Sequence, residues 1–344
     1  MNKKKWWLLL PLILIVAYLV GPRPATPEYS SALPVLSLSG KELEALIIKN
    51  ESLHHLKPDN EARIVWANDS LKDQTEYSIV YLPGFTASQA EGEPIHRNIS
   101  KKFGCNLFLS RLADHGIDTT EPLLQFTVDK YWASAKEAFA IGRQLGKKVI
   151  LMGTSTGGTL ALRLAAAYPE IAALVLLSPN IEINDPNAWL LNNHWGLQIA
   201  RMVTGSEYLD SKDQRPLYKQ YWTHHYRIEA AVQLQELIET SMTPEIFAKV
   251  NQPALMLYYY KDDVHQDSVV KVSAMKQMFS ELGTPAQARR EHAIPMAGDH
   301  VIGSYIRSKD LATVEKEIEN FLTDVIKIRT LQPLIHDSLS NQTN

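Results

Sequence analysis

The feature of this sequence that most constrains its fold is the turn GTSTGG at residues 153–158, which joins two segments of opposite character. The run before it, KKVILM, is typical of a buried strand, and the segment after it, TLALRLAAAYP, is typical of a helix. Glycines on both sides of Ser155 leave room for a strand and a helix to cross closely. The pattern G-x-S-x-G indicates a plain strand-to-helix turn or a turn that presents Ser155 as a nucleophile. Its position between strand and helix favours the nucleophile.

The rest of the chain alternates short apolar runs with segments of helical periodicity. We expect a first strand in ARIVWAND, followed by strands in SIVYL, NLFLSRL, KVILMG, AALVLLSP, ALMLYYY and REHAIPM. The 344 residues, of which 45% are hydrophobic, are sufficient for one large core with an insertion. The alternation predicts an α/β fold whose parallel sheet has helices on both faces.

One long interval, between the strand expected at 172–178 and the strand expected at 254–260, lacks a strong strand pattern. Its helical segments, with Trp and Tyr between them, predict an inserted helical cap. The aromatic residues of this interval either line an acyl pocket or only pack the cap together. The expected organisation is a signal segment at 1–22, a linker and short helix at 23–58, a core at 59–180 and 250–330, a cap at 181–249 and a tail at 331–344.

The N-terminus combines a basic segment, MNKKK, with the apolar run WWLLLPLILIVAYLV at residues 6–20. This combination is typical of a secretory signal. The run is short for a membrane span, which needs about 20 residues. A cleaved signal peptide and an uncleaved transmembrane signal anchor therefore both remain open. Either predicts export, with the chain secreted or held at the membrane on its periplasmic or extracellular side.

Composition argues against several other classes of protein. The net charge of −3 and the lack of a basic run beyond the first residues argue against nucleic-acid binding. The single cysteine, Cys105, rules out an internal disulfide, and its apolar neighbours indicate a core position. There is no H-E-x-x-H, no Walker A sequence, and no G-x-G-x-x-G after a strand. We therefore expect no metal and no cofactor.

A nucleophilic serine needs a base, and His300 is the leading candidate among the histidines. Where a nucleophile stands on this kind of turn, the chain order is serine, acid, then histidine. His300, in MAGDHVIGS, follows the last expected strand, where a loop can return it to the strand ends. His292 lies within that strand and His336 lies in the tail, so both are weaker alternatives.

The acid is expected after ALMLYYY, in the segment KDDVHQD. Asp262 and Asp263 compete, and the apolar Val264 two residues after Asp262 favours that residue. Its carboxylate would hold the imidazole tautomer and stabilise the imidazolium. Asp267 and Asp299 are weaker candidates.

An acyl-transfer site also needs two N–H donors for the developing oxyanion. One is the N–H of Thr156, the residue after the serine. The other is expected in LPGFTAS, where Pro83 has no N–H but Phe85 offers one.

Five motifs, LPGFTAS, GTSTGG, SPN, KDDV and GDH, make residues 60–325 resemble the α/β-hydrolase superfamily. Within it, the chain resembles the monoacylglycerol lipase and serine aminopeptidase-like group. The resemblance implies a mostly parallel eight-stranded sheet with a helical cap inserted after the sixth strand. It also implies hydrolysis through an acyl-enzyme without a cofactor.

These observations leave hypotheses of different classes. The first is a serine hydrolase that acts on a small-molecule, acyl or lipid-like carboxylic ester. The second is an aminopeptidase-like enzyme, in which Glu91 and Glu93 would hold a free α-amine. The third is a non-catalytic binding protein on the same scaffold. The oligomeric state is not predicted.

Overall fold

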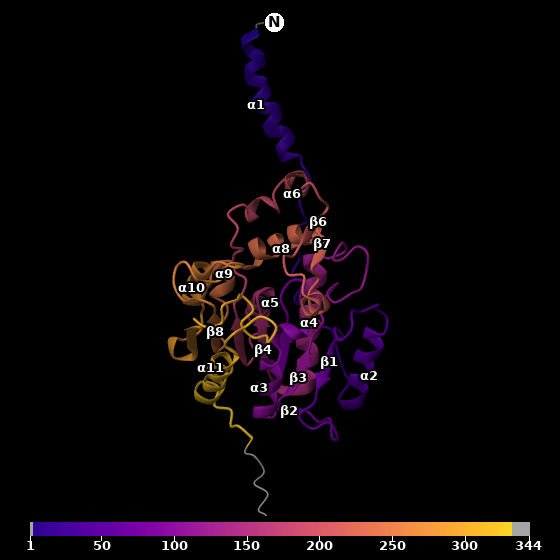
Figure 1. The fold of residues 1–344 in the computed structure, drawn as a ribbon, viewed down its shortest axis with the longest axis vertical. Helices are drawn as coiled ribbons and strands as arrows, with labels where there is room; N and C mark the ends of the chain where they lie inside the picture. The colour runs from indigo at the N-terminus through magenta and orange to yellow at the C-terminus, as the bar shows by residue number, and fades with distance from the viewer. Residues whose placement is uncertain (1–2, 332–344) are drawn as a thin grey trace, which may run out of the picture.

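The computed structural model describes residues 3–331 (Figure 1). Most of the predicted tail at 331–344, including His336, therefore lies outside the described residues.

The predicted α/β class is confirmed by the main sheet. Within residues 3–331 this sheet has seven strands in the order β1-β3-β2-β4-β5-β8-β9, whereas the resemblance implied eight. β1 is antiparallel to β3, and every other neighbouring pair in this sheet is parallel. The strands are β1 (Arg63–Val65), β2 (Thr75–Leu82), β3 (Asn106–Leu109), β4 (Gly146–Thr154), β5 (Ala173–Leu177), β8 (Ala254–Tyr258) and β9 (Arg289–Ala293).

Helices cover both faces of this sheet. The main ones are α2 (Gly40–Glu51), α3 (Ile95–Phe103), α4 (Val128–Leu145), α5 (Thr156–Ala167), α10 (Val272–Glu281) and α11 (Leu311–Asp324). Apolar residues of α4, α5 and α10 belong to one buried cluster, and those of α3 and α11 belong to another. The two clusters are the two layers expected of an α/β fold.

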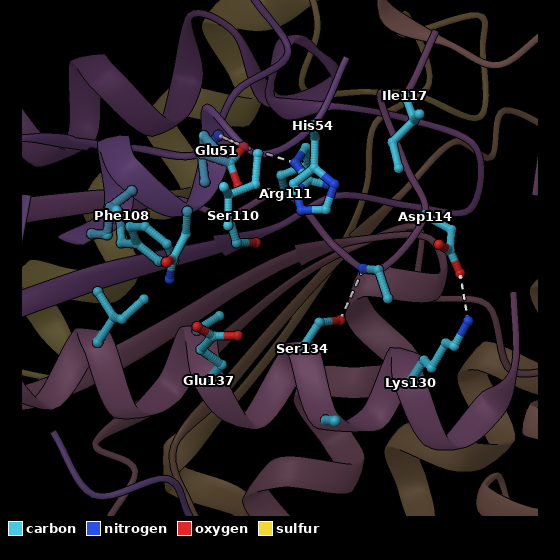
Figure 2. A pocket seen from close by; sticks show the side chains of 18 residues that line it. Glu51, His54, Phe108, Ser110, Arg111, Asp114, Ile117, Lys130, Ser134 and Glu137 are labelled. Atoms are coloured by element: carbon cyan, nitrogen blue, oxygen red, sulfur yellow. Dashed lines mark hydrogen bonds and ion pairs between the residues drawn. The ribbon is translucent and has the colours of Figure 1, made fainter. Parts of the chain in front are cut away.

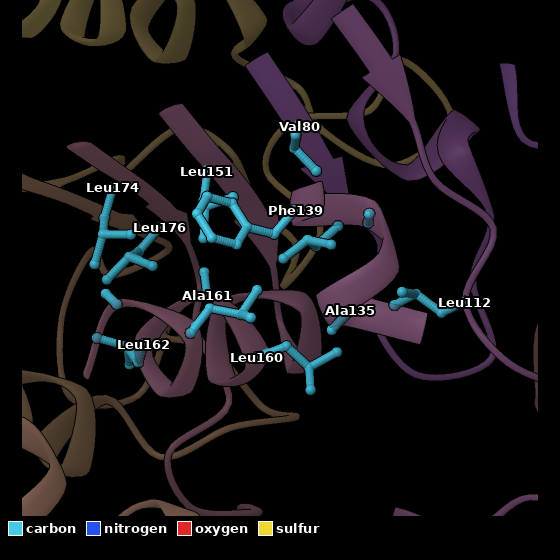
Figure 3. Packing of buried hydrophobic residues seen from close by; sticks show 14 of the residues in the cluster. Val80, Leu112, Ala135, Phe139, Leu151, Leu160, Ala161, Leu162, Leu174 and Leu176 are labelled. Carbon is cyan, nitrogen blue, oxygen red and sulfur yellow. The ribbon is translucent and has the colours of Figure 1, made fainter. Parts of the chain in front are cut away.

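The alternation of side chains along β4 explains how one strand serves both layers. Leu151 packs in the cluster with α4 and α5, while Ile150 and Met152 pack in the cluster with α3 and α11. Figure 3 shows the first layer, where Phe139 of α4 and Leu160 of α5 lie under the strands. Burial of both strand faces is why the strands appear in the sequence as continuous apolar runs.

The interval between β5 and β8 forms a mixed cap. It contains α6 (Gly196–Thr204), α7 (Pro216–Tyr221), α8 (Ile228–Ser241), α9 (Pro244–Phe247), a 3₁₀ turn at Ala188–Leu190, and the antiparallel pair β6 (Tyr208–Asp210) and β7 (His225–Arg227). In Figure 1 most of these elements lie between α1 (Lys3–Leu19) and the main sheet. The helical cap expected from the sequence therefore also includes a small sheet. Its strands, three residues each, are too short to give a periodic signal.

The predicted transmembrane segment is wrong. Among the described residues, none of the helices has both the length and the apolar character required to pass through a bilayer. The first helix, α1, has 17 residues, equivalent to roughly 25 Å at 1.5 Å per residue, against about 30 Å of hydrocarbon. Export of the chain stays a prediction.

Candidate active site

Ser155 stands on a strained turn between β4 and α5. Its φ of 52° and ψ of −121° are unusual for a residue with a side chain. Four backbone hydrogen bonds hold it there: Ser155 N–H donates to Leu177 O at 2.9 Å, and Ser155 O accepts from the N–H groups of Gly158 at 2.8 Å, Asn180 at 3.0 Å and Thr159 at 3.2 Å. Surrounding structure thus fixes the backbone that the G-x-S-x-G pattern predicted.

The glycines around Ser155 are required by close backbone contacts. A Cβ on Gly157 would lie 1.9 Å from the carbonyl oxygen of Leu82, and one on Gly153 would lie 2.5 Å from the carbonyl carbon of Gly157. These distances explain why β2, β4 and α5 can meet beneath the serine only if both positions lack side chains.

His300 forms an ion pair with Asp267. Nδ1 of His300 lies 2.6 Å from Oδ2 of Asp267, and their side chains are 7% and 0% exposed. The other carboxylate oxygen accepts from the N–H groups of Val269 at 2.8 Å and Val270 at 3.1 Å. Because a carboxylate only accepts, Nδ1 carries a proton and Nε2 is the nitrogen available for base chemistry.

The structure does not bring Asp262 or Asp263 to His300. Asp262 is exposed and accepts from the N–H of Val264 at 3.0 Å and of His265 at 2.8 Å. Asp263 accepts from the hydroxyl of Tyr260 at 2.7 Å. These aspartates lie in an exposed turn closed by a bridge between Tyr260 and Gln266, and Asp267 comes directly after that bridge. The aspartate that contacts His300 is therefore Asp267, and not Asp262, which the sequence favoured.

His292 is also separated from the site. It is exposed on β9, with Nε2 3.4 Å from Glu317 Oε2. Of the two described histidines weighed as the base, His300 is the one that lines a cavity with Ser155.

Electrostatics around His300 favour its charged form. Burial opposes the imidazolium, but the charges of Asp267, Glu91 and Asp299 outweigh burial and raise its pKa. Its Nε2 is buried and has no hydrogen-bond partner among the described residues. A ring oriented at Nδ1 and unpaired at Nε2 is suited to accept a proton from a nearby hydroxyl.

The expected oxyanion donors lie at the same cavity. Phe85 and Thr156 both line it, and within residues 3–331 their N–H groups donate to no protein acceptor. The loop that carries Phe85 is braced by the cap: Ser88 N–H donates to Tyr221 O at 2.9 Å, and Thr223 N–H donates to Thr86 O at 2.8 Å. Two amides are therefore available beside Ser155.

The cavity above Ser155 has a volume of about 420 Å³, within the range of small-molecule sites. Part of its wall is apolar and comprises Phe85, Ile183, Leu191, Leu209, Trp222, Tyr226, Ala231, Leu234 and Val269. Another part is polar and includes Ser211, Asp299 and Arg307, of which Arg307 pairs with Asp299 at 2.8 Å. The cavity thus combines apolar and polar side chains in its wall.

A second cavity, of about 500 Å³, lies between α2, β3 and α4 (Figure 2). It contains Ser110 and Ser134, but both hydroxyls are engaged: Ser110 donates to Tyr81 O at 2.6 Å and Ser134 donates to Tyr131 O at 2.9 Å. Glu51 in its wall pairs with Arg111 at 2.7 Å. Among the described residues that line this cavity, neither serine hydroxyl is therefore free in the way that a nucleophile requires.

Comparison with known proteins shows which families and folds this chain resembles. Residues 127–289 match the profile of the family described as "Serine aminopeptidase, S33". The thermostable monoacylglycerol lipase of Bacillus sp. (strain H-257) is 29% identical over 105 residues, which cover 30% of this chain and 41% of the lipase. The aligned segment is thus less than half of that relative.

Solved structures share the fold at low sequence identity. One comes from the metagenome-derived lipolytic enzymes LipS and LipT and has a TM-score of 0.61, 16% identity, and coverage of 78% of this chain and 98% of that one. The monoacylglycerol lipase of Paleococcus ferrophilus has a TM-score of 0.53, 13% identity, and coverage of 76% and 97%. With the profile match, these findings confirm the resemblance to the α/β-hydrolase superfamily and its monoacylglycerol lipase and serine aminopeptidase-like group.

Proposed function

We propose that the protein is a serine hydrolase that cleaves carboxylic esters. The observation that carries the proposal is one cavity lined by Ser155, on its strained turn, and by His300, oriented by Asp267. The lipase and lipolytic relatives support the same class of substrate.

In the proposed reaction, Oγ of Ser155 attacks the acyl carbon while Nε2 of His300 takes its proton. The N–H groups of Phe85 and Thr156 stabilise the oxyanion of the tetrahedral intermediate. His300 then returns the proton to the leaving alcohol, and the acyl group stays on Ser155. Water, activated by the same ring, hydrolyses this acyl-enzyme and restores the serine.

The walls of the cavity suggest how an ester would lie. The apolar residues Ile183, Leu191 and Leu234 suit the acyl chain. The polar residues Ser211 and Arg307 suit a leaving alcohol that carries further polar groups. This arrangement favours an acyl or lipid-like ester over a wholly polar substrate.

The peptidase alternative has less support. The carboxylate of Glu91 accepts from Gly84 N–H at 2.5 Å, and that of Glu93 pairs with Arg97 at 2.8 Å. Both groups proposed to hold a free α-amine are therefore already engaged. Comparison of aminoacyl naphthylamides with acyl esters separates these activities.

The test is turnover of p-nitrophenyl esters, from acetyl to dodecanoyl, by the full chain and by Ser155→Ala. We expect the variant to lose roughly 10⁵–10⁶-fold in kcat, because nucleophile and base act as a unit. Fluorophosphonate labelling of the native chain but not of Ser155→Ala provides the second readout. Equal ester rates in both proteins would reject the proposal, and absence of labelling would favour the binding-protein alternative.

A further inference from the structure

Glu91 is a buried carboxyl group that lines the cavity but has no role in the reaction proposed for Ser155, His300 and Asp267. It lies on the 3₁₀ turn η1 (Gln89–Gly92), is 2% exposed, and lines the cavity with Ser155 and His300. Burial of a carboxylate is costly unless it is paired or hydrogen-bonded. Its position therefore calls for specific partners.

The turn that carries Glu91 is held in place from several sides. Ser304 Oγ donates to Ala90 O at 2.7 Å, and Nε2 of His96 lies 2.9 Å from Gln89 O. Glu91 N–H donates to Ser88 O at 3.1 Å. These bonds fix where the carboxylate sits.

The first partner of the carboxylate is the oxyanion loop. Gly84 N–H donates to Glu91 Oε2 at 2.5 Å, and Gly84 O accepts from Ala87 N–H at 3.2 Å. Gly84 C=O and Phe85 N–H belong to one planar peptide unit. Holding Gly84 at both ends therefore fixes the direction of the Phe85 N–H.

The carboxylate is also close to the nucleophile. Oε1 of Glu91 and Cβ of Ser155 lie 2.9 Å and 3.0 Å from the point that a Cβ on Gly84 would occupy. Gly84 is the residue that lets Glu91 and Ser155 approach each other this closely.

The second partner is the base. The charge of Glu91 favours the protonated form of His300, in addition to the charges of Asp267 and Asp299. Burial raises the pKa of Glu91 to about 7, against the Gly84 hydrogen bond, the charge of His300, and the side chains of Trp222 and Tyr81. Each of these two groups therefore favours the charged form of the other.

Taken together, these contacts point to a positioning role. Resting on the proposed ester hydrolysis, we propose that Glu91 positions the oxyanion loop through Gly84 and, from the cavity wall that it shares with His300, favours the imidazolium of that ring. Glu91 acts through these groups and forms no covalent bond with the substrate.

The neighbouring groups make a pH profile informative. The ionisable side chains that interact with Glu91 include Tyr81, Tyr131 and Tyr218, and burial raises the pKa of each above its usual value. Arg307, which lines the same cavity, forms an ion pair with Asp299 at 2.8 Å. Because these tyrosines stay protonated near neutral pH, the pH profile of kcat/KM there is sensitive to His300 and Glu91.

The experiment compares Glu91→Gln, Glu91→Ala and the control Glu93→Gln with the native chain. The glutamine keeps an oxygen for Gly84 N–H but removes the charge, whereas alanine removes both. We expect the acidic limb of kcat/KM to move to lower pH by roughly one unit in Glu91→Gln, because the imidazolium loses a favourable charge. In Glu91→Ala we expect kcat/KM to fall further, up to about 10²–10³-fold below that of the native chain, because the Phe85 N–H is no longer held toward the oxyanion. Glu93→Gln keeps the native profile.

Titration of the His300 ring by NMR tests the same proposal without turnover. Its pKa should fall in Glu91→Gln by the amount seen in the kinetic limb. An unchanged ring pKa, or native kcat/KM at all pH values in both Glu91 variants, overturns the role of Glu91. Ester turnover that is independent of Ser155 overturns the proposed function, whatever the ring titration shows.

Discussion

At the scale of single residues, we predict different effects on kcat for substitutions of Asp262 and Asp267. We expect Asp267→Asn to lower kcat roughly 10³–10⁴-fold, because the amide no longer fixes the tautomer of His300 or stabilises its charge. Asp262→Asn should leave kcat within about twofold, because Asp262 is exposed and bonds within its own turn. The measurement is ester kcat at neutral pH for both variants.

The control for that comparison is folding. Both variants should keep the native circular dichroism spectrum, since neither replacement changes side-chain volume appreciably. A large loss of kcat in Asp262→Asn with native activity in Asp267→Asn would reverse the assignment of the acid.

The contrast between these residues shows what sequence can predict about the site. The close backbone contacts of Gly157 require a glycine, which is visible in the sequence as part of G-x-S-x-G. His300 was predicted from its position after the serine and the expected acid along the chain. The acid depends on how a short loop closes, here through the bridge between Tyr260 and Gln266, and both aspartates lie within that loop region. Glu91 carries no sequence signal for its role, because its partner Gly84 is identified only by the folded turn.

At the scale of secondary-structure elements, the crossing of β2 and α5 depends on Gly157. Gly157→Ala would place a Cβ 1.9 Å from Leu82 O, where the obstacle is backbone and cannot rotate away. We expect the free energy of unfolding to fall by about 2 kcal/mol or more, measured by urea denaturation.

Gly303→Ala is the matched control. Its new Cβ would approach Cδ1 of Leu177 at 3.0 Å, the end of a side chain that can move. The loss of stability should be clearly smaller than for Gly157→Ala. Equal stability losses in the two variants would contradict the packing explanation.

Strands and helices were predictable from the sequence where burial requires a long run of apolar residues. β4 and α5 have continuous apolar segments, and both appear where the sequence indicates. The cap strands β6 and β7 were missed because their pairing, such as Tyr208 with Arg227, is set by tertiary contacts. The apolar run within α1 was evident and already short for a membrane span, and the helix that forms has 17 residues.

At the scale of the whole molecule, buried histidines make stability depend on pH. Burial lowers the pKa of His96 to about 3 and that of His115 to about 4. The unfolded chain, in which histidine has a pKa near 6.5, therefore binds protons that the folded chain does not. We expect the free energy of unfolding to fall as pH drops below about 6.5, and to continue falling toward about 4.

His115→Phe tests this prediction, because it removes one titrating group from an aromatic site where His115 stacks on Tyr131 at 5.2 Å. The variant also loses the contact with Ala113 O, so its absolute stability can differ. The diagnostic quantity is the slope of unfolding free energy against pH, which should become shallower between about pH 6.5 and about pH 5. Parallel slopes for the native chain and the variant would refute the linkage.

The backbone bonds between residues 86–88 and residues 221–223 have a consequence for timing. If the cap moves outward to admit a bulky ester, its hydrogen bonds to Thr86 and Ser88 would displace the loop that carries them. The N–H of the neighbouring Phe85 would then no longer point toward the oxyanion position. The Phe85 N–H would then be in place only while the cap is closed. With the cap open, the protein would not catalyse hydrolysis, and an ester too bulky for the cap to close over would be released unhydrolysed.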